Sequence, residues 1–133
     1  MPRFLSIYKT VEKNTPPSPE EMARMGQLVG EGFKSGFLIA TEGCLPTALG
    51  ARVQLSQNEF SVTDGPFTEA KEVVAGFAIL NASSKEEAIR LAKDFLQVCG
   101  EGECEIRQVF EAGECPGLAT NAAGNKKEPA LAS

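Results

Sequence analysis

Short stretches of alternating or continuous apolar residues predict six β-strands, and two longer stretches with helical spacing predict two helices. The strands are expected at residues 3–9, 37–41, 51–56, 59–62, 73–80 and 104–110. Because the stretch at 73–80 is apolar at consecutive positions, it predicts a central strand covered on both faces. Gly76 interrupts that stretch and indicates a β-bulge or the close approach of another segment.

Both predicted helices begin with a capping sequence. Ser18 is expected to be the N-cap of the first helix, with Glu21 completing a capping box, and Ser84 and Glu87 repeat the pattern in the second. Apolar residues at every third or fourth position then predict one buried stripe per helix. The stripes are Met22, Met25, Leu28, Val29 and Phe33 in the first helix, and Ala88, Leu91, Ala92, Phe95 and Cys99 in the second.

Three glycines lie inside the first predicted helix, at Gly26, Gly30 and Gly32. Each costs about 1 kcal/mol relative to alanine in a helix. We expect them to allow the helix to pack closely on a sheet; the alternative is that the bare face admits a ligand or a partner. Gly36 is expected to end the connection from the first helix to the next strand, and Gly100 is expected to close the second helix.

The densest group of turn-forming and charged residues is the segment 63–72. It follows a predicted hairpin whose two-residue turn is Gln57-Asn58, since asparagine tolerates positive φ. Asp64 is a common first residue of a turn, and Pro66 restricts the loop that follows. We therefore expect this segment to set the start of the central strand.

The element order β–α–β–(ββ)–β–α–β predicts an α+β fold, a ferredoxin-like sandwich with an inserted hairpin and both helices on one sheet face. A second copy of the chain is the economical cover for the other face, so a homodimer packed through the sheet is expected. Residues 1–116 are predicted to form one domain. Residues 117–133 lack periodicity and apolar surface, which predicts a disordered tail.

Composition excludes several functional classes. The net charge of −5 argues against nucleic acid as a direct partner, because phosphate binding needs clustered Lys and Arg. The longest apolar run is too short for a membrane span and no signal sequence opens the chain, so a cytoplasmic location is expected. No phosphate-binding glycine loop or dinucleotide fingerprint is present, so no cofactor is expected.

The chain has four cysteines and no histidine. The absence of histidine rules out a Ser–His or Cys–His dyad within the chain. Cys99 and Cys104 are spaced as a zinc site could use, but without histidine or a CxxC pair no metal site is expected. Cys44 is expected to be inert, because no histidine is available to activate it.

Residues 64–72, with the sequence DGPFTEAKE, and the following VAGF at 74–77 resemble the signature of the YCII-related, or DGPF-domain, family. The resemblance covers roughly residues 3–111. It implies a dimeric α+β barrel similar to muconolactone isomerase. Most members of the family have no assigned reaction; one relative acts on a chlorinated hydroxyquinol, and some members resemble partners encoded beside, or fused to, extracytoplasmic-function sigma factors.

A related branch of the family has a His–Asp pair proposed as an active site. Only the carboxylate half can be present here, and Asp64 is its natural carrier. Asp64 is therefore the candidate general acid or base; the alternative is that its carboxylate caps the turn through the N–H groups of Gly65, Phe67 or Thr68. The charged residues after it could equally be a solvated cluster. The candidate ligand-binding residues are Tyr8, Glu42, Thr63, Gly65, Pro66, Phe67, Lys71 and Glu72.

Three functions follow as hypotheses. The first is an enzyme that acts on a small aromatic or polar organic molecule in a barrel cavity near Asp64. The second is a non-catalytic module that binds such a molecule. The third is a protein-interaction module linked to sigma-factor-dependent transcriptional regulation. A cavity with converging carboxylates favours the first two, whereas a filled interior favours the third.

Overall fold

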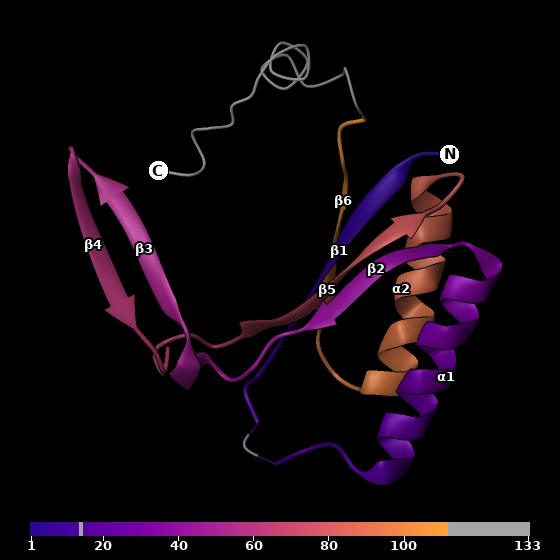
Figure 1. Cartoon of the computed structure of the whole chain (residues 1–133), viewed down its shortest axis with the longest axis horizontal. Helices are drawn as coiled ribbons and strands as arrows, with labels where there is room; N and C mark the ends of the chain where they lie inside the picture. Colours follow the sequence, from indigo (N-terminus) through magenta and orange to yellow (C-terminus); the bar gives the residue numbers. More distant parts are fainter. Residues whose placement is uncertain (14, 112–133) are drawn as a thin grey trace.

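The computed structural model describes residues 1–13 and 15–111, and it contains the predicted elements in the predicted order (Figure 1). The predicted tail at 117–133 and Cys115 lie outside the described residues. The elements are β1 (Arg3–Thr10), α1 (Pro19–Ser35), β2 (Leu38–Gly43), η1 (Thr47–Leu49), β3 (Ala51–Ser56), β4 (Glu59–Asp64), β5 (Val73–Asn81), α2 (Lys85–Cys99) and β6 (Glu103–Gln108).

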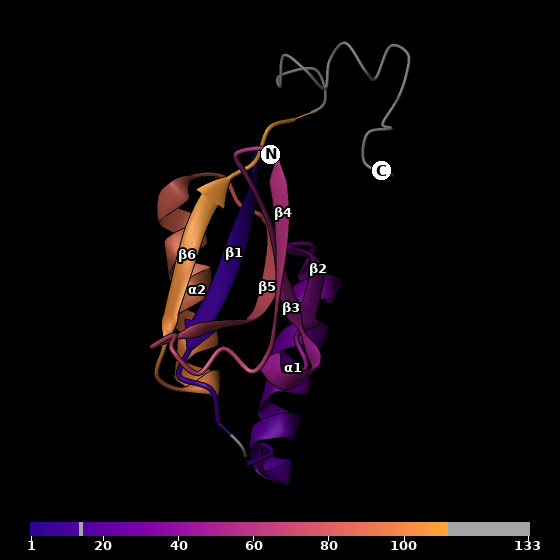
Figure 2. The same ribbon diagram turned by 90° about the vertical axis from the view of Figure 1, so that its left-hand side faces the viewer.

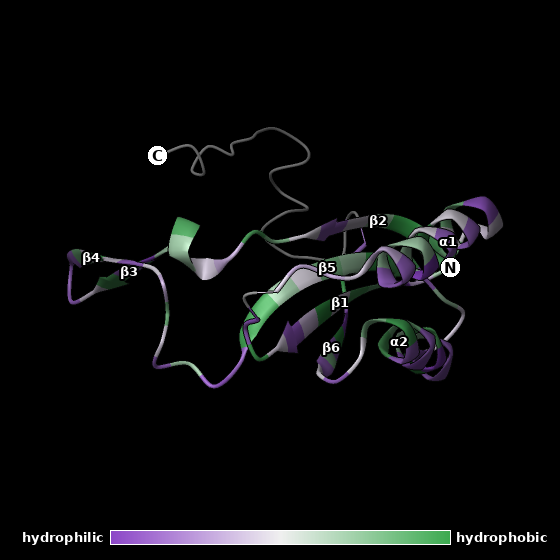
Figure 3. Cartoon of the chain, turned by 90° about the horizontal axis from the view of Figure 1, so that it is seen from below, coloured by the Kyte–Doolittle hydropathy of each residue, from purple (hydrophilic) through white to green (hydrophobic). Residues whose placement is uncertain are grey.

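Four strands form one antiparallel sheet in the order β2-β5-β1-β6, and β3 and β4 form a separate two-stranded sheet. Both helices cover the same face of the larger sheet (Figures 1 and 3). This is the ferredoxin-like arrangement with an inserted hairpin that the element order predicted. Within one chain the sheet is open and is not a closed barrel. The expectation that β5 is covered on both faces therefore fails for a single chain, because no described element packs on the face opposite the helices. We call that side the open face.

The first capping box is confirmed and the second is only half right. In α1, Glu21 N–H donates to Ser18 Oγ (3.1 Å) and Ser18 N–H donates to Glu21 Oε1 (2.8 Å). In α2, Glu87 N–H donates to Ser84 Oγ (3.1 Å), but the Glu87 carboxylate accepts from Ser83 N–H (2.6 Å), one residue earlier than predicted. Both arrangements satisfy N–H groups that the first turn of a helix leaves without partners.

The buried core lies between the two helices and the central strands. It consists of Phe4, Leu38, Leu80, Ala82, Ala88 and Leu91. The predicted stripe of α2 is confirmed at Ala88, Leu91 and Ala92, whereas in α1 Met22 and Phe33 are largely exposed. The core therefore occupies only part of the space between the layers.

Of the three glycines in α1, only Gly32 is needed for close packing. A Cβ at Gly32 would lie 2.9 Å from Leu38 Cβ, closer than real side chains approach. A Cβ at Gly26 or Gly30 would meet nothing within 4 Å, so the close-packing interpretation is wrong for those two. Gly36, between α1 and β2, is the C-cap of α1 and adopts the left-handed conformation with φ of +92°.

The β3–β4 hairpin, residues 51–64, projects away from the rest of the chain, and we call it the arm. It extends on the side of the sheet opposite the helices (Figures 1, 2 and 3). Its predicted two-residue turn is confirmed, with φ of +52° at Gln57 and +64° at Asn58. Every residue of β3 and β4 is exposed.

Hydrogen bonds centred on Thr47 hold the base of the arm. Thr47 N–H and Oγ1 each donate to the Glu12 carboxylate at 2.7 Å, and Phe67 N–H donates to Thr47 Oγ1 at 3.2 Å. Gly65 N–H donates to the Gly50 carbonyl oxygen at 2.9 Å. A Cβ at Gly65 would overlap the Thr47 carbonyl oxygen, so this position has no room for a side chain.

Arg52 of β3 completes this junction from the arm. Its guanidinium lies 3.8 Å from the centroid of the Phe67 ring and donates to the Glu69 carboxylate at 2.6 Å. A cation stacked on an aromatic ring while paired to a carboxylate restrains both partners. The segment that follows Asp64 is therefore a structural junction between the arm and η1.

We predict that Gly65→Ala destabilises the protein by about 3 kcal/mol, because the added methyl group must displace backbone. Urea unfolding followed by circular dichroism measures this. The matched control is Gly30→Ala, where the Cβ meets open space and helix propensity should add about 1 kcal/mol of stability. Equal stability of Gly65→Ala and the parent protein would show that the contact with Thr47 is not a constraint.

Candidate functional site

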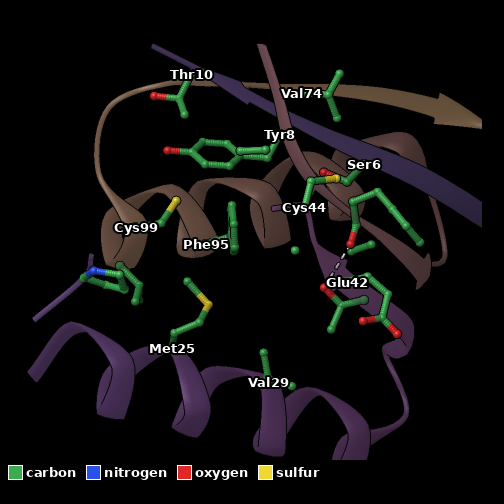
Figure 4. Close-up of a pocket in the computed structure, with 18 of the residues that line it drawn as sticks. Ser6, Tyr8, Thr10, Met25, Val29, Glu42, Cys44, Val74, Phe95 and Cys99 are labelled. Carbon is green, nitrogen blue, oxygen red and sulfur yellow. Dashed lines mark hydrogen bonds between the residues drawn. The ribbon is translucent and has the colours of Figure 1, made fainter. Parts of the chain in front are cut away.

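A cavity of about 960 Å³ lies between the helices and the sheet. Core residues Leu38, Leu80 and Leu91 border one end of it, and the loops after β1 and β2 border the other. Side chains from α1 (Met25 and Val29), from α2 (Phe95 and Cys99) and from β1 (Tyr8) point into it (Figure 4). Its size is at the upper end of the range typical of small-molecule sites, about 300–1,000 Å³.

Small residues account for the space. Gly26 of α1, Gly76 and Ala78 of β5, and Ala92 of α2 all line the cavity. Gly26 is exposed, and a Cβ there would meet nothing within 4 Å, so this position borders open space at the edge of the cavity. A larger side chain at Gly26, Ala78 or Ala92 would occupy part of the volume, whereas a Cβ at Gly76 would meet the backbone of Glu42.

Alternate residues of β1 supply the polar groups of the cavity. Ser6, Tyr8 and Thr10 fall on the helix-facing side of the strand, because side chains alternate between the two faces. Tyr8 Oη and Thr10 Oγ1 both donate to the Glu101 carbonyl oxygen, at 2.9 and 3.0 Å. The Tyr8 ring meets the Phe95 ring edge-on, with centroids 5.2 Å apart. These contacts hold Tyr8 in one position.

Burial raises the pKa values of the tyrosine and cysteine side chains of the interior further above physiological pH. Burial, reinforced by the neighbouring Cys99 thiol, raises the pKa of Tyr8 to about 12. Burial also raises the pKa of Cys99 and that of Cys104. A protonated thiol is a weak nucleophile. The Tyr8 hydroxyl and the Cys99 thiol are therefore hydrogen-bond partners in the cavity rather than reactive anions, and carboxylates such as Glu42 also line it.

The carboxylate of Glu12, at the rim of the cavity, is already engaged. Its hydrogen bonds from the Thr47 backbone and side chain lower the pKa of Glu12. A carboxylate stabilised in this way stays ionised and is a poor proton acceptor. Glu12 therefore acts as a structural link between the rim and η1.

Two of the candidate residues from the sequence line the cavity, namely Tyr8 and Glu42. The close approach predicted at Gly76 is confirmed, and it involves the same region: a Cβ at Gly76 would lie 2.7 Å from the Glu42 carbonyl oxygen. The predicted bulge is also present, as a register shift opposite Tyr8 and Lys9. The missing side chain at Gly76 thus lets β2 and β5 come together beside the cavity.

The remaining candidates lie at the base of the arm and do not line the cavity. Asp64 is exposed at the end of β4, paired with Ala51, and Thr63 pairs with Arg52. The sequence predicts that the Asp64 carboxylate accepts from the N–H of Gly65, Phe67 or Thr68. This is wrong for the first two, because Gly65 N–H donates to the Gly50 carbonyl oxygen and Phe67 N–H donates to Thr47 Oγ1. Pro66 follows Gly65 through a cis peptide bond, and Lys71 and Glu72 are exposed before β5.

The structure thus brings Tyr8 and Glu42 to one cavity and leaves Asp64 outside it. Sequence reasoning missed Ser6, Thr10 and Cys99. The alternation along β1 was a usable signal, because it places Ser6 and Thr10 on the same face as Tyr8. Cys99 belonged to the predicted buried stripe of α2, but nothing local to it indicated a cavity.

Three further observations concern metal ligands, helix length and the cysteines. Within residues 1–13 and 15–111, no group of three or more Cys, Asp or Glu side chains is arranged to hold a metal ion. None of the described helices is long and apolar enough to cross a membrane. Cys44, Cys99 and Cys104 are free thiols.

The fold and the cavity define a ferredoxin-like α+β protein with a pocket between its helical layer and its sheet. The model of the YCII-related domain matches residues 3–112, so the chain belongs to the YCII-related family. An uncharacterized protein of Rhizobium meliloti (strain 1021) is 35% identical over 86 residues, which cover 62% of this chain and 69% of that protein. The family expected from residues 64–77 is therefore confirmed.

We predict that Tyr8 ionises with a midpoint near pH 12 rather than at the ordinary 10.0. Tyr8 is the only tyrosine and the chain has no tryptophan, so absorbance at 295 nm reports this group alone. Because the folded state holds the proton more tightly than the unfolded state, stability should persist below pH 10.0 and fall as the pH rises toward about 12.

The control for this titration is the protein unfolded in urea, which should ionise near 10.0. Cys99→Ala should shift the folded midpoint downward, because the thiol contributes to the elevated pKa, but burial should keep it above 10.0. A folded midpoint at the ordinary value would mean that solvent reaches the hydroxyl freely.

Proposed function

We propose that this protein binds a small, largely apolar organic molecule that carries one or more polar groups. The observation that carries the proposal is the cavity of about 960 Å³ between the helices and the sheet. Met25, Val29 and Phe95 supply its apolar surface, and the hydroxyl groups of β1 supply polar contacts. An apolar pocket with few polar groups is the usual form of a small-molecule site. An aromatic ring system bearing a hydroxyl group matches this lining.

Binding is better supported than catalysis. Tyr8 and Cys99 have raised pKa values and stay protonated at neutral pH, and Glu12 is held by Thr47. Asp64, the candidate acid or base, lies outside the cavity. A general base must be within hydrogen-bond reach of the proton that it removes. The proposed activity is therefore that of a ligand-binding module.

We predict that 2-naphthol, as a probe, binds in the cavity and that Gly26→Leu weakens binding at least tenfold. The leucine would project into open space that now belongs to the cavity. Calorimetric titration measures the affinity, and the midpoint of thermal unfolding should rise with probe concentration by mass action.

The matched control is Gly30→Leu, one turn further along α1. A Cβ there also meets nothing within 4 Å, but Gly30 does not line the cavity, so its affinity for 2-naphthol should stay within twofold of the parent. Equal affinity in both variants would place the probe elsewhere on the protein. If no small aromatic molecule binds to the protein, the proposal is wrong.

We further propose that the protein is a homodimer packed through the open face of the sheet. The strand register places Leu5, Ile7 and Ile79 on that face, with charged residues of β6 at its margin. In a lone chain these apolar side chains are covered only by their neighbours in the sheet. A second copy related by a twofold axis would cover the same surface on both chains.

We predict that Ile7→Arg converts the dimer to a monomer. The arginine would place a charge at the centre of the open face, where two copies would bring like charges together. Sedimentation equilibrium measures the mass. The matched control is Ile89→Arg on the exposed surface of α2, which should leave the dimer intact. A parent protein that is monomeric at millimolar concentration would contradict the proposed dimer.

A further inference from the structure

The arm has one apolar face and one polar face. Val53 is directly opposite Val62, and Leu55 is opposite Phe60, so all four side chains lie on the same side of the hairpin. Their exposed fractions are 70% for Val53, 59% for Leu55, 74% for Phe60 and 64% for Val62. The other side carries the pairs Arg52–Thr63, Gln54–Ser61 and Ser56–Glu59, which are polar or charged.

The alternation in the arm is the pattern of a strand pair with one buried face, yet in the single chain that face is in water. An isolated two-stranded hairpin is marginally stable in water. Here the base is held by Arg52, Gly65 and Phe67 at the junction with η1, so the arm leaves the domain in a defined direction. These features indicate a surface that is completed by a partner.

The area of this surface fits a dimer contact. At their exposures, the four side chains present roughly 400 Å² of apolar surface, comparable to the largest patch on a typical monomeric protein. Two symmetry-related arms would therefore bury roughly 800 Å² of apolar surface, about half of the ~1,600 Å² in a standard stable interface. The remainder is within what two open sheet faces can supply.

The position of the arm indicates that a second copy of the chain covers its apolar face. The arm extends on the same side of the molecule as the open face, so a chain seated on that face would stand beside the arm (Figures 1 and 3). A twofold axis would then place each arm along its partner, and one packing operation would cover both apolar surfaces. The arm has no clustered Lys or Arg, which does not favour nucleic acid.

We propose that the arm clasps a second copy of this chain, with the face formed by Val53, Leu55, Phe60 and Val62 packed against the partner. The proposal rests on the homodimer proposed above and adds the arm to its interface. Packing against the partner stabilises the hairpin of the arm, because an isolated two-stranded sheet is marginally stable and needs a second layer to cover its apolar face.

The test replaces Leu55 and Phe60 together by threonine, which removes apolar area but keeps a residue type that favours strands. The matched control replaces the adjacent pair Gln54 and Ser61, on the polar face, by threonine. Sedimentation equilibrium should show the dimer dissociation constant rising at least 100-fold for Leu55→Thr/Phe60→Thr and changing less than threefold for Gln54→Thr/Ser61→Thr.

A second measurement reports the contact itself. Hydrogen exchange of the amides of β3 and β4 is followed in the parent protein well above and well below its dimer dissociation constant. The clasp predicts that exchange in both strands slows at least tenfold in the dimer. Circular dichroism and thermal unfolding of both variants verify that the domain remains folded.

The outcomes separate the two proposals. If Ile7→Arg abolishes the dimer but the Leu55 and Phe60 substitutions do not weaken it, and the arm exchanges equally in monomer and dimer, the clasp is overturned and the sheet-face dimer stands. If the parent is monomeric throughout, both are overturned. If the arm is protected only when another protein or an added ligand is present, its occupant is not a second copy. Binding of 2-naphthol is independent of all three outcomes.

Discussion

The central strands β1 and β5 carry apolar side chains on both faces, whereas the helices cover only one. Because side chains alternate along a strand, these two strands have one face covered by the helices and one open face. The residues at 6, 8 and 10 of β1 face the helices and the cavity, and those at 5 and 7 lie on the open face. The cavity and the proposed dimer interface are therefore opposite sides of the same two strands, and a change of register by one residue would exchange them.

On the covered side, packing density varies along the sheet. Gly32 brings α1 close to Leu38, and the core forms there. Toward the start of α1, the exposed Gly26 borders open space, and Ala78 lines the cavity from β5. A well-packed end and a hollow end in one sandwich are consistent with selection for a pocket, since empty apolar volume in a core reduces stability. The hydroxyl groups of β1 and the Glu42 carboxylate line this hollow end together with apolar side chains.

The family signature at residues 64–72 lies at the base of the arm and outside the cavity. Its glycine is required because Gly65 lies against the Thr47 carbonyl, and Phe67 provides both an N–H donor to Thr47 and a ring for Arg52. Thr47 in turn is bound by Glu12 at the cavity rim. The junction thus connects the loop after β1, η1 and the arm. A signature of this kind can mark the residues that set the geometry of a fold rather than those that touch a ligand.

The sequence by itself determined the features that depend on neighbouring residues: the six strands, both helix N-caps, the Gln57-Asn58 turn, the interruption at Gly76 and the ferredoxin-like order. It also placed Tyr8 and Glu42 among the candidates, and both line the cavity. Only the tertiary structure decided that Asp64 lies apart from them, that the cavity is beneath α1, and that the arm leaves from the open face. Those outcomes depend on contacts between distant segments, such as the bond from Thr47 to Glu12 across 35 positions, and on how far a helix stands from a sheet. Capping and alternation act over a few residues, so they carry no information about such distances.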